Sequence, residues 1–422
     1  MTKPATVLVV NCGSSSIKMA LIVLDSGQRI ATGLAERLGQ ADAVLYWHSD
    51  EGKREEVILA DSGYDAVLQQ MLELVSQRFG SQKIKAVGHR IVHGGERFVS
   101  PALLNDEVIH QIELLSHLAP LHNPINLLGI KNAREQFSAV PHVAVFDTAF
   151  HHSMPLRASL YAVPYRWYQD YGIRRYGFHG ISHHYVAQEA ARRLGREMRD
   201  CQLLTAHLGN GCSATAVRNG ISVDTTMGFT PLEGLMMGTR SGDIDPGLHA
   251  FISKQTGADV EEITRTLNYE SGLLGISGLS YDMRTLLDAA KAGNERVVLA
   301  VDMFCYRLAK ALAALAVALD EVHALVFTGG IGEHADIVRM QTCRHLSSIG
   351  IKLDTERNRQ HGRGSDGAIG KDGSPVSVLV IATNEEWMIA KYVCAILDKK
   401  KDSEYYKRTI TESDHPMTGF PE

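Results

Sequence analysis

The chain lacks an excess of charge of either sign. Its 422 residues include 43 Lys and Arg against 48 Asp and Glu, which gives a formal net charge of -5 at pH 7. Nucleic-acid-binding proteins concentrate Lys and Arg on one face, and the sequence contains no such basic stripe. A nucleic acid is therefore not expected among the partners.

A long apolar run is also missing. Residues 1–6 lead directly into the apolar residues 7–10, without the basic segment and cleavage site of a signal peptide. No stretch is long enough to span a bilayer. The longest apolar candidate, residues 308–319, is interrupted by Lys310 and is expected to be a core helix. We therefore expect no membrane contact.

Regular cysteine spacing is absent too. The six cysteines form no CxxC pair and no even framework. Disulfides are rare in reducing compartments, so a cytoplasmic location is the default expectation.

Two similar units are present in the sequence about 200 residues apart. Residues 7–23 and 203–217 each consist of an apolar strand, a turn of glycine and small polar residues, and a second apolar strand. Since the length also favours roughly two domains, we predict a duplicated fold in which each half offers a phosphate-binding hairpin.

The segments between and after these hairpins alternate between strand and helix patterns. Residues 86–92 and 143–146 are predicted strands, while 106–117 and 295–319 are predicted helices. Such alternation indicates an α/β fold. Residues 354–374 contain five glycines and are expected to be a weakly ordered loop, and the polar residues 401–422 to be a solvated tail.

The first hairpin turn, residues 11–18, has the sequence NCGSSSIK. Glycine allows close backbone approach, the serines supply hydroxyl donors, and Lys18 supplies a positive charge. Phosphoryl transfer needs such donors around the moving group. Alone, the pattern also fits a serine-rich hairpin without a ligand. A third phosphate or nucleotide element is predicted at residues 324–333, where a strand followed by glycines is typical of backbone amides approaching an anion.

Two arginines lie beside glycines at predicted loops. Arg90 ends a strand next to Gly94 and Gly95, and Arg240 lies in the turn-rich residues 239–247. A guanidinium suits carboxylates and phosphates. Surface arginines are the alternative interpretation, but together Arg90 and Arg240 could neutralise a reacting anion from two sides.

His179 and His183 are spaced four residues apart and so suggest a metal site on one helix face. That interpretation is not favoured, because the glutamate of the HExxH motif is missing. Gly180 interrupts a helix there, so His179 is expected to act alone as a donor to phosphate. His183 and His184 are predicted to be structural, and His151 and His152 stay unassigned.

Carboxylates follow two apolar strands. Asp147 ends the strand at residues 143–146, where catalytic or metal-organising acids often lie in open α/β sheets. A helix N-cap is about equally compatible with its local sequence. Glu385 and Glu386 follow a later strand and would suit the Mg²⁺ that accompanies ATP.

Taken together, these motifs resemble those of the acetate and propionate kinase family. The resemblance runs in order from about Val7 to about Ile396 and includes these stretches: NCGSSSIK, GHRIVHGGE, APLHNP, VFDTAFH, YGFHGISH, HLGNG, MGTRSGDIDPG, DMR, TGGIGE and TNEE. It implies the duplicated actin-like (ribonuclease H-like) ATPase fold of the actin, hexokinase and heat-shock-protein superfamily, with two lobes and an ATP cleft between them.

By this resemblance, residues 1–150 would form the N-terminal lobe, joined again by 386–400, and residues 151–385 the nucleotide-binding C-terminal lobe. The resemblance also implies a homodimer. The expected reaction is reversible in-line transfer of the γ-phosphoryl group from ATP to a short-chain carboxylate, which gives an acyl phosphate.

The resemblance assigns roles residue by residue. Asp147, His179 and Arg240 match the catalytic positions, and an orienting role is favoured for Asp147 because a carboxylate substrate is already ionised. Asn11 and Glu385 would hold Mg²⁺. The substrate carboxylate would bind Arg90, and its alkyl chain would contact Val92, Leu121, Phe178 and Pro231. ATP would contact Lys18, His207, Leu208, Gly209, Asn210, Gly211, Asp282, Met283, Arg284, Gly329, Gly330, Ile331, Gly332 and Glu333.

The length of the acyl chain is less sharply predicted. One methylene changes selectivity by only about 1–3 kcal/mol. Residues 151–154 and 275–279 are slightly more similar to propionate kinases, so propionate is favoured and acetate is expected as a second substrate. Gly88 is predicted to leave room for the acyl tail. Acetate or butyrate kinase is the near alternative, and a catalytically inactive nucleotide-binding sensor is the alternative of another class.

Overall fold

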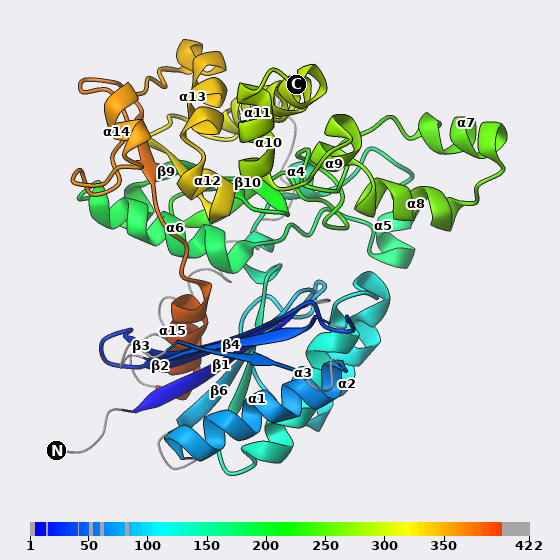
Figure 1. Ribbon diagram of the computed structural model, residues 1–422, viewed down its shortest axis with the longest axis vertical. Helices are drawn as coiled ribbons and strands as arrows, with labels where there is room; N and C mark the ends of the chain where they lie inside the picture. The colour runs from blue at the N-terminus through cyan, green and yellow to red at the C-terminus, as the bar shows by residue number, and fades with distance from the viewer. Residues whose placement is uncertain are drawn as a thin grey trace, which may run out of the picture. The chain divides into compact units, whose positions relative to one another are not determined.

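The computed structural model describes residues 5–13, 16–40, 42–49, 54–59, 63–80 and 84–398. The chain forms two compact units, each with its own sheet (Figure 1). The first unit takes in Met1–Ala149 and Asn384–Glu422, and the second takes in Phe150–Thr383. Ser14, Ser15 and the predicted tail at residues 401–422 lie outside the described residues. The α/β class expected from the sequence is confirmed.

The sheet of the first unit has the strand order β5-β4-β3-β2-β1-β6-β8-β7. Its strands are β1 (Thr6–Cys12), β2 (Ser16–Val23), β3 (Arg29–Glu36), β4 (Val44–Ser49), β5 (Arg54–Ile58), β6 (Ile84–Ile91), β7 (Ala102–Leu103) and β8 (His142–Phe146). The central strands β1, β6 and β8 are parallel to one another and almost wholly buried, which explains their continuous apolar runs. The predicted first hairpin is present, with Asn11 opposite Lys18.

In the described part of this unit there are four α-helices: α1 (Tyr64–Phe79), α2 (Asp106–Leu114), α3 (Asn123–Gln136) and α15 (Glu385–Leu397). A short 3-10 helix follows α2, so the predicted helix at residues 106–117 is present with a tighter last turn. The side chains of α1 that face the sheet are buried with Leu8, Leu21 and Leu45 in one core cluster. Burial of this apolar stripe anchors the helix layer to the strands that carry the candidate site.

Gly88 on β6 does not face a space for an acyl chain. A Cβ atom built on Gly88 would lie 2.7 Å from Cγ2 of Ile389 and 2.9 Å from Cγ2 of Val393, both on α15. Gly88 therefore allows α15 to pack closely on the sheet, and its predicted role in substrate length is wrong.

The sheet of the second unit has the order β11-β10-β9-β12-β13. Its strands are β9 (Gln202–Leu208), β10 (Cys212–Arg218), β11 (Ile221–Thr225), β12 (Ala324–Thr328) and β13 (Ser377–Val380). The second predicted hairpin is β9–β10, which pairs Leu208 with Cys212. β12 is parallel to β9 and passes directly from Thr328 into a helix.

The α-helices of this unit lie before its first strand and between its strands. They are α4 (Leu156–Ser159), α5 (Arg166–Tyr171), α6 (Gly180–Arg193), α7 (Gly247–Thr256), α8 (Val260–Tyr269), α9 (Gly272–Ser277), α10 (Met283–Lys291), α11 (Glu295–Ala316), α12 (Gly329–His334), α13 (Asp336–His345) and α14 (Thr355–Arg359). The longest, α11, begins at the N-cap Asn294 and buries one face along its length.

The glycine-rich residues 354–374 are more ordered than predicted. They include α14, and Asn358 in that helix accepts hydrogen bonds from the buried Arg339, at 2.8 Å to both its side-chain and backbone oxygens. Arg357 also forms two hydrogen bonds with Asp372. These contacts fix the segment in spite of its glycines.

The two sheets repeat one topology. In the first, β3-β2-β1 are antiparallel neighbours and β1-β6-β8 are parallel. In the second, β11-β10-β9 are antiparallel and β9-β12-β13 are parallel. The duplication inferred from the two hairpins is therefore confirmed. Within the described residues, no helix is long and apolar enough to cross a membrane.

Candidate active site

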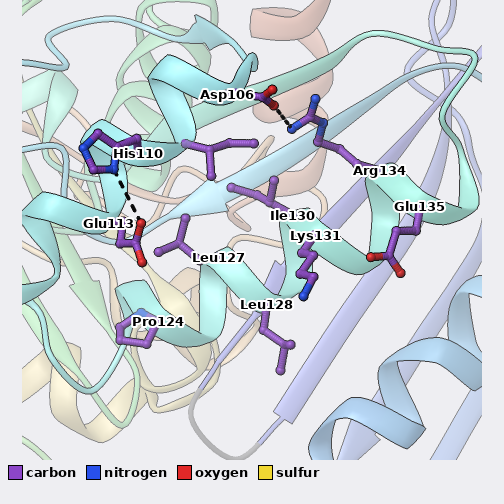
Figure 2. A pocket seen from close by; sticks show the side chains of 11 residues that line it. Asp106, His110, Glu113, Pro124, Leu127, Leu128, Ile130, Lys131, Arg134 and Glu135 are labelled. Carbon is purple, nitrogen blue, oxygen red and sulfur yellow. Dashed lines mark hydrogen bonds and ion pairs between the residues drawn. The ribbon is translucent and has the colours of Figure 1, made fainter.

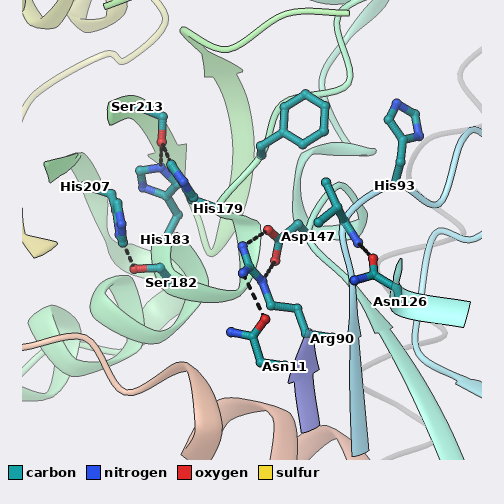
Figure 3. Close-up of polar contacts among 12 residues, drawn as sticks. Asn11, Arg90, His93, Asn126, Asp147, His179, Ser182, His183, His207 and Ser213 are labelled. Carbon is teal, nitrogen blue, oxygen red and sulfur yellow. Dashed lines mark hydrogen bonds and ion pairs between the residues drawn. The ribbon is translucent and has the colours of Figure 1, made fainter. Parts of the chain in front are cut away.

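Three predicted site residues of the first unit meet at the ends of its parallel strands. Arg90 donates from Nε to Oδ1 of Asp147 at 3.0 Å, and from Nη2 to Oδ2 at 2.5 Å. Its Nη1 also donates to Oδ1 of Asn11 at 3.3 Å (Figure 3). Asp147 therefore binds an arginine rather than capping a helix, because both of its carboxylate oxygens accept from Arg90.

Arg90 is charged, and not all of its N–H groups are used in the contacts described above. Burial lowers the pKa of its guanidinium, but Asp147 and then Glu385 outweigh that effect and raise it overall. An arginine carries five N–H groups, and within the part of the chain that the structure describes three are used by these contacts. The two that remain are able to hold a carboxylate.

Glu385 adds a second acid to this cluster. It begins α15, and burial raises the pKa of its carboxyl, while Arg90 lowers it and Asp147 raises it further. Lys18 also acts electrostatically on Glu385 and is exposed on β2 opposite Asn11. The structure thus gathers Asn11, Arg90, Asp147 and Glu385, with Lys18 on the adjoining strand.

Two buried asparagines on α3 support this strand edge. Asn126 accepts from the backbone amide of Val92 at 3.0 Å and donates to the carbonyl of Cys12 at 2.8 Å. Asn123 exchanges two hydrogen bonds with the backbone of His93. The sequence analysis missed both roles, although both residues follow or lie within the APLHNP stretch; the only available signal was polar residues at inward helix positions.

The predicted apolar contacts of the first unit differ in exposure. Val92 is buried, whereas Leu121 is 54% exposed. An exposed leucine is able to contact a ligand without rearranging a core.

A separate groove of about 690 Å³ lies between α2 and α3 (Figure 2). It is lined by residues such as Ile109, Leu127 and Leu128, and none of the predicted site residues line it. Among its lining side chains, Arg134 pairs with Asp106 at 3.0 Å, and His110 lies 3.6 Å from Glu113. The groove therefore offers no arrangement suited to phosphoryl transfer.

In the second unit, His179 has a backbone conformation that few residues with side chains adopt. Its φ is 57° and it directly precedes α6, so Gly180 begins this helix rather than interrupting one. Such conformations cost energy and cluster at functional sites. The strain supports a functional role for His179.

Ser213 joins His179 to His183. Its hydroxyl lies 2.9 Å from Nδ1 of His179 and 2.8 Å from Nε2 of His183, whose Nδ1 contacts the Thr205 hydroxyl at 2.7 Å (Figure 3). Burial lowers the pKa of His183 well below its usual value, so this ring is neutral. Among the residues described, no group of three or more acids, histidines or cysteines is placed to hold a metal. The two rings share a serine instead.

His207 stacks on His179 with ring centroids 4.3 Å apart. Its Nδ1 lies 2.8 Å from the hydroxyl of Ser182, which in turn contacts the hydroxyl of Thr383. His207 is the last but one residue of β9, so the second hairpin places its turn beside His179.

Arg240 approaches the same turn. A Cβ built on Gly211 would lie 3.4 Å from Cε1 of His179 and 3.5 Å from Nη1 of Arg240, so both side chains border this glycine. Nη1 donates to the carbonyl of Pro231 at 3.1 Å. Burial lowers the pKa of Arg240, but an arginine at neutral pH stays charged. His179 and Arg240 thus converge on the glycine turn, as an anion-stabilising pair requires.

Phe178 is buried, and its carbonyl accepts from Nε2 of His151 at 3.0 Å. His151, unassigned from the sequence, also contacts Ser222 at 2.8 Å. Gly177 has φ +74, and a Cβ there would lie 2.7 Å from the His151 ring. Only glycine lets the chain pass so close to this histidine and then place Phe178 and His179.

The remaining predicted nucleotide residues occupy two helix starts. Gly329 begins α12, and its amide donates to Oε1 of Glu333 at 3.0 Å. The side chain of Glu333 therefore folds back to the start of its own helix. Gly330 has open space where a side chain would be. Asp282 caps α10 through the amide of Thr285 and accepts from Arg284, while Met283 is buried.

Comparison with known proteins places these features in a family. The Acetokinase family profile matches residues 6–391. The acetate kinase of Deinococcus radiodurans is 52% identical over 391 residues, which cover 92% of this chain and 98% of the relative. A propionate kinase structure from Francisella tularensis has a TM-score of 0.87 at 42% identity, covering 92% and 98% of the two chains. The Porphyromonas gingivalis acetate kinase structure has a TM-score of 0.86 at 40% identity, covering 93% and 100%.

Proposed function

Because the chain belongs to the acetokinase family of carboxyl-group phosphotransferases, we propose that it phosphorylates a short-chain carboxylate directly with the γ-phosphoryl group of ATP. The products would be ADP and an acyl phosphate, and the reaction would be reversible. The observation that carries this proposal is Arg90, which Asp147 and Asn11 orient while two of its N–H groups stay available.

We assign the substrate carboxylate to Arg90. A fork of two N–H groups matches the two oxygens of a carboxylate. Asp147 orients this fork and takes no proton, because the acceptor acid is ionised at neutral pH. The alkyl chain is assigned to the apolar residues named from the sequence: Val92, Leu121, Phe178 and Pro231.

We assign stabilisation of the transferring phosphoryl group to His179 and Arg240. Both border Gly211. Charge on the equatorial oxygens of the phosphoryl group is best met by such fixed donors. Transfer would then be in line, without a covalent enzyme intermediate.

The nucleotide is assigned to the second glycine hairpin and the two helix starts. ATP is the co-substrate of the family. The support in this chain is the turn that follows His207 and the unobstructed start of α12 at Gly330. Lys18 is proposed to contact the phosphates from the first hairpin.

Mg²⁺ is proposed to bind Asn11 and Glu385. Their amide and carboxylate oxygens are the hard ligands that this ion prefers, and Glu385 is a half-buried acid within a charged cluster, so the donor set fits. When bound, Mg²⁺ neutralises phosphate charge. Activity should disappear with excess chelator and return when Mg²⁺ is restored.

Propionate is proposed as the preferred acceptor, with acetate also used. The support is the similarity of residues 151–154 and 275–279 to propionate kinases, together with the 42% identical propionate kinase structure. The 52% identity to a protein named acetate kinase favours acetate as the alternative. The ratio of kcat/KM for the two acids decides between them, and a ratio below one for propionate over acetate would reject the preference.

The decisive assay supplies ATP, Mg²⁺ and hydroxylamine with acetate, propionate or butyrate in turn. Hydroxylamine traps an acyl phosphate as a coloured hydroxamate, so a product with any acid supports the kinase. ATP binding without a product from any of the three acids would instead indicate the nucleotide-binding sensor.

A homodimer is proposed through the α7–α8 region of the second unit. On α7, Leu248, Phe251 and Ile252 lie at helical spacing and are all exposed, and none of its residues is buried. Clustered apolar side chains mark association surfaces. Light scattering should give twice the chain mass, and Phe251→Glu should give a monomer; a monomeric wild-type protein would contradict the proposal.

A further inference from the structure

A loop in the second unit contacts Arg240 and the backbone that leads into His179, the two residues assigned to phosphoryl stabilisation. The carbonyl of Gly228 accepts from the amides of Tyr176 and Gly177, at 3.0 and 3.3 Å, just before His179 in the chain. The carbonyl of Pro231 accepts from Nη1 of Arg240 at 3.1 Å. Residues 226–233 therefore contact Arg240 directly and are linked to His179 through the backbone of Tyr176 and Gly177.

Three side chains hold this loop. Glu233 accepts from Nη2 of Arg175 at 2.6 Å and from the hydroxyl of Tyr161 through a short hydrogen bond. The Tyr161 hydroxyl accepts from the amide of Phe229 at 2.7 Å. Arg175 donates to the carbonyl of Thr226 at 2.8 Å. The loop is thus bound at its beginning, middle and end by one hydrogen-bonded cluster.

The cluster is partly shielded from water and closely packed. The side chain of Glu233 is 28% exposed and that of Arg175 is 19% exposed. The Arg175 guanidinium also lies over the Tyr161 ring, 5.8 Å from its centroid. Burial is the main cause that raises the pKa of Tyr161, and the neighbouring carboxylate of Glu233 raises it further. The hydroxyl therefore stays protonated and donates.

Gly228 makes this packing possible. A Cβ built on Gly228 would overlap the carboxylate of Glu233 and the hydroxyl of Tyr161. The acid and the phenol therefore lie directly against the loop backbone, where any side chain at position 228 would displace them.

We propose that Glu233, Tyr161 and Arg175 form a loop clamp of positioning residues, which sets the geometry of Arg240 and His179 for transfer without touching the substrate. The proposal rests on the proposed function, since it assumes that these two residues stabilise the transferring group. A displacement of about 1 Å in such a group costs roughly 100-fold in rate, so a loose clamp should lower kcat.

Tyr161→Phe and Glu233→Gln test the clamp in the full-length protein. Each keeps the size of the side chain while removing hydrogen bonds to the loop. We expect kcat to fall at least tenfold, whereas KM for ATP and the thermal midpoint change little. Asp372→Asn is the matched control, because it removes a carboxylate that forms two hydrogen bonds with Arg357 elsewhere in this unit; it should keep wild-type kcat.

A double-mutant comparison separates positioning from general stability. If Glu233 acts through Arg240, then Glu233→Gln should lower kcat no further in a protein that already carries Arg240→Lys. Independent, multiplicative losses, or a wild-type kcat in Tyr161→Phe, would overturn the clamp. If Glu233→Gln does not fold, Tyr161→Phe in the Arg240→Lys protein gives the same comparison. A wild-type enzyme that forms no hydroxamate would instead contradict the proposed function itself.

Discussion

Asp147 accepts two hydrogen bonds from one edge of the Arg90 guanidinium. Nε donates to Oδ1 at 3.0 Å and Nη2 donates to Oδ2 at 2.5 Å. The side chain of Asp147 is only 1% exposed, so water does not compete for its oxygens. Arg90 is therefore oriented before any anion arrives. Such preorganisation reduces the entropy that binding must otherwise lose.

Asp147→Asn should damage both activity and stability. It keeps the shape of the side chain but leaves the charge of Arg90 without its carboxylate, a change that typically costs about 3–5 kcal/mol at buried pairs. We expect kcat/KM for the acid to fall by roughly 100-fold because the guanidinium is no longer fixed. Steady-state kinetics and urea unfolding measure the two effects. A value of kcat/KM near that of wild type would contradict the orienting role.

Arg90→Ala and Arg240→Ala should differ in which kinetic constant they change. Loss of a donor used in the transition state costs about 10²–10³ in kcat, so Arg240→Ala should act mainly on kcat. Arg90→Ala should also raise KM for the acid, because it removes the proposed carboxylate site. Rates measured at varied acid concentration distinguish the two variants.

Arg265→Ala is the control for these arginine variants. Arg265 is an exposed arginine paired with Glu270 in the second unit, so its removal should leave both constants unchanged. Turnover close to wild type in Arg90→Ala or Arg240→Ala would refute the corresponding role.

Features encoded by neighbouring residues were predictable from the sequence. Each hairpin needs only two apolar strands and a glycine turn, so β1–β2 and β9–β10 follow from local pattern. The pairing of Arg90 with Asp147 was not predictable in the same way, because it joins the ends of two strands 57 residues apart. Glu233 and Tyr161 are 72 residues apart, and neither lies in a motif that suggested catalysis.

The strand that contains Gly88 was predicted correctly, but the role of Gly88 within it was not. Alternate residues of a strand face the same side, so Gly88 and Arg90 share one face of β6. That face meets α15: Arg90 lies near its first residue, Glu385, whereas Gly88 lies under Ile389 and Val393. The packing of α15, which follows nearly 300 residues later, decides which position meets a ligand and which is core.

Gly88→Val should therefore destabilise the protein rather than change its substrate. Extra methyl groups would overlap Ile389 and Val393, and overpacking typically costs about 1–3 kcal/mol. Urea unfolding should show this loss, while the ratio of kcat/KM for propionate and acetate stays at its wild-type value. A changed ratio with unchanged stability would restore the discarded role in substrate length.

Several buried histidines make stability depend on pH. Burial lowers the pKa values of His89, His142 and His183, and lowers that of His93 to about 3. In the unfolded chain each imidazole has a pKa of about 6.5. Below that pH the unfolded chain therefore binds protons that these folded histidines do not.

By proton linkage, the stability that these neutral histidines contribute is fully present above about pH 6.5. It is lost as the pH falls toward their pKa values in the folded protein. Each such histidine adds a slope of roughly 1.4 kcal/mol per pH unit. His93→Gln should make the plot of unfolding free energy against pH shallower by about that amount between pH 6 and 4.5. The same substitution at His110, which is 63% exposed, is the control and should keep the wild-type slope. Equal slopes for His93→Gln and wild type would show that His93 is not the buried neutral group that its surroundings indicate.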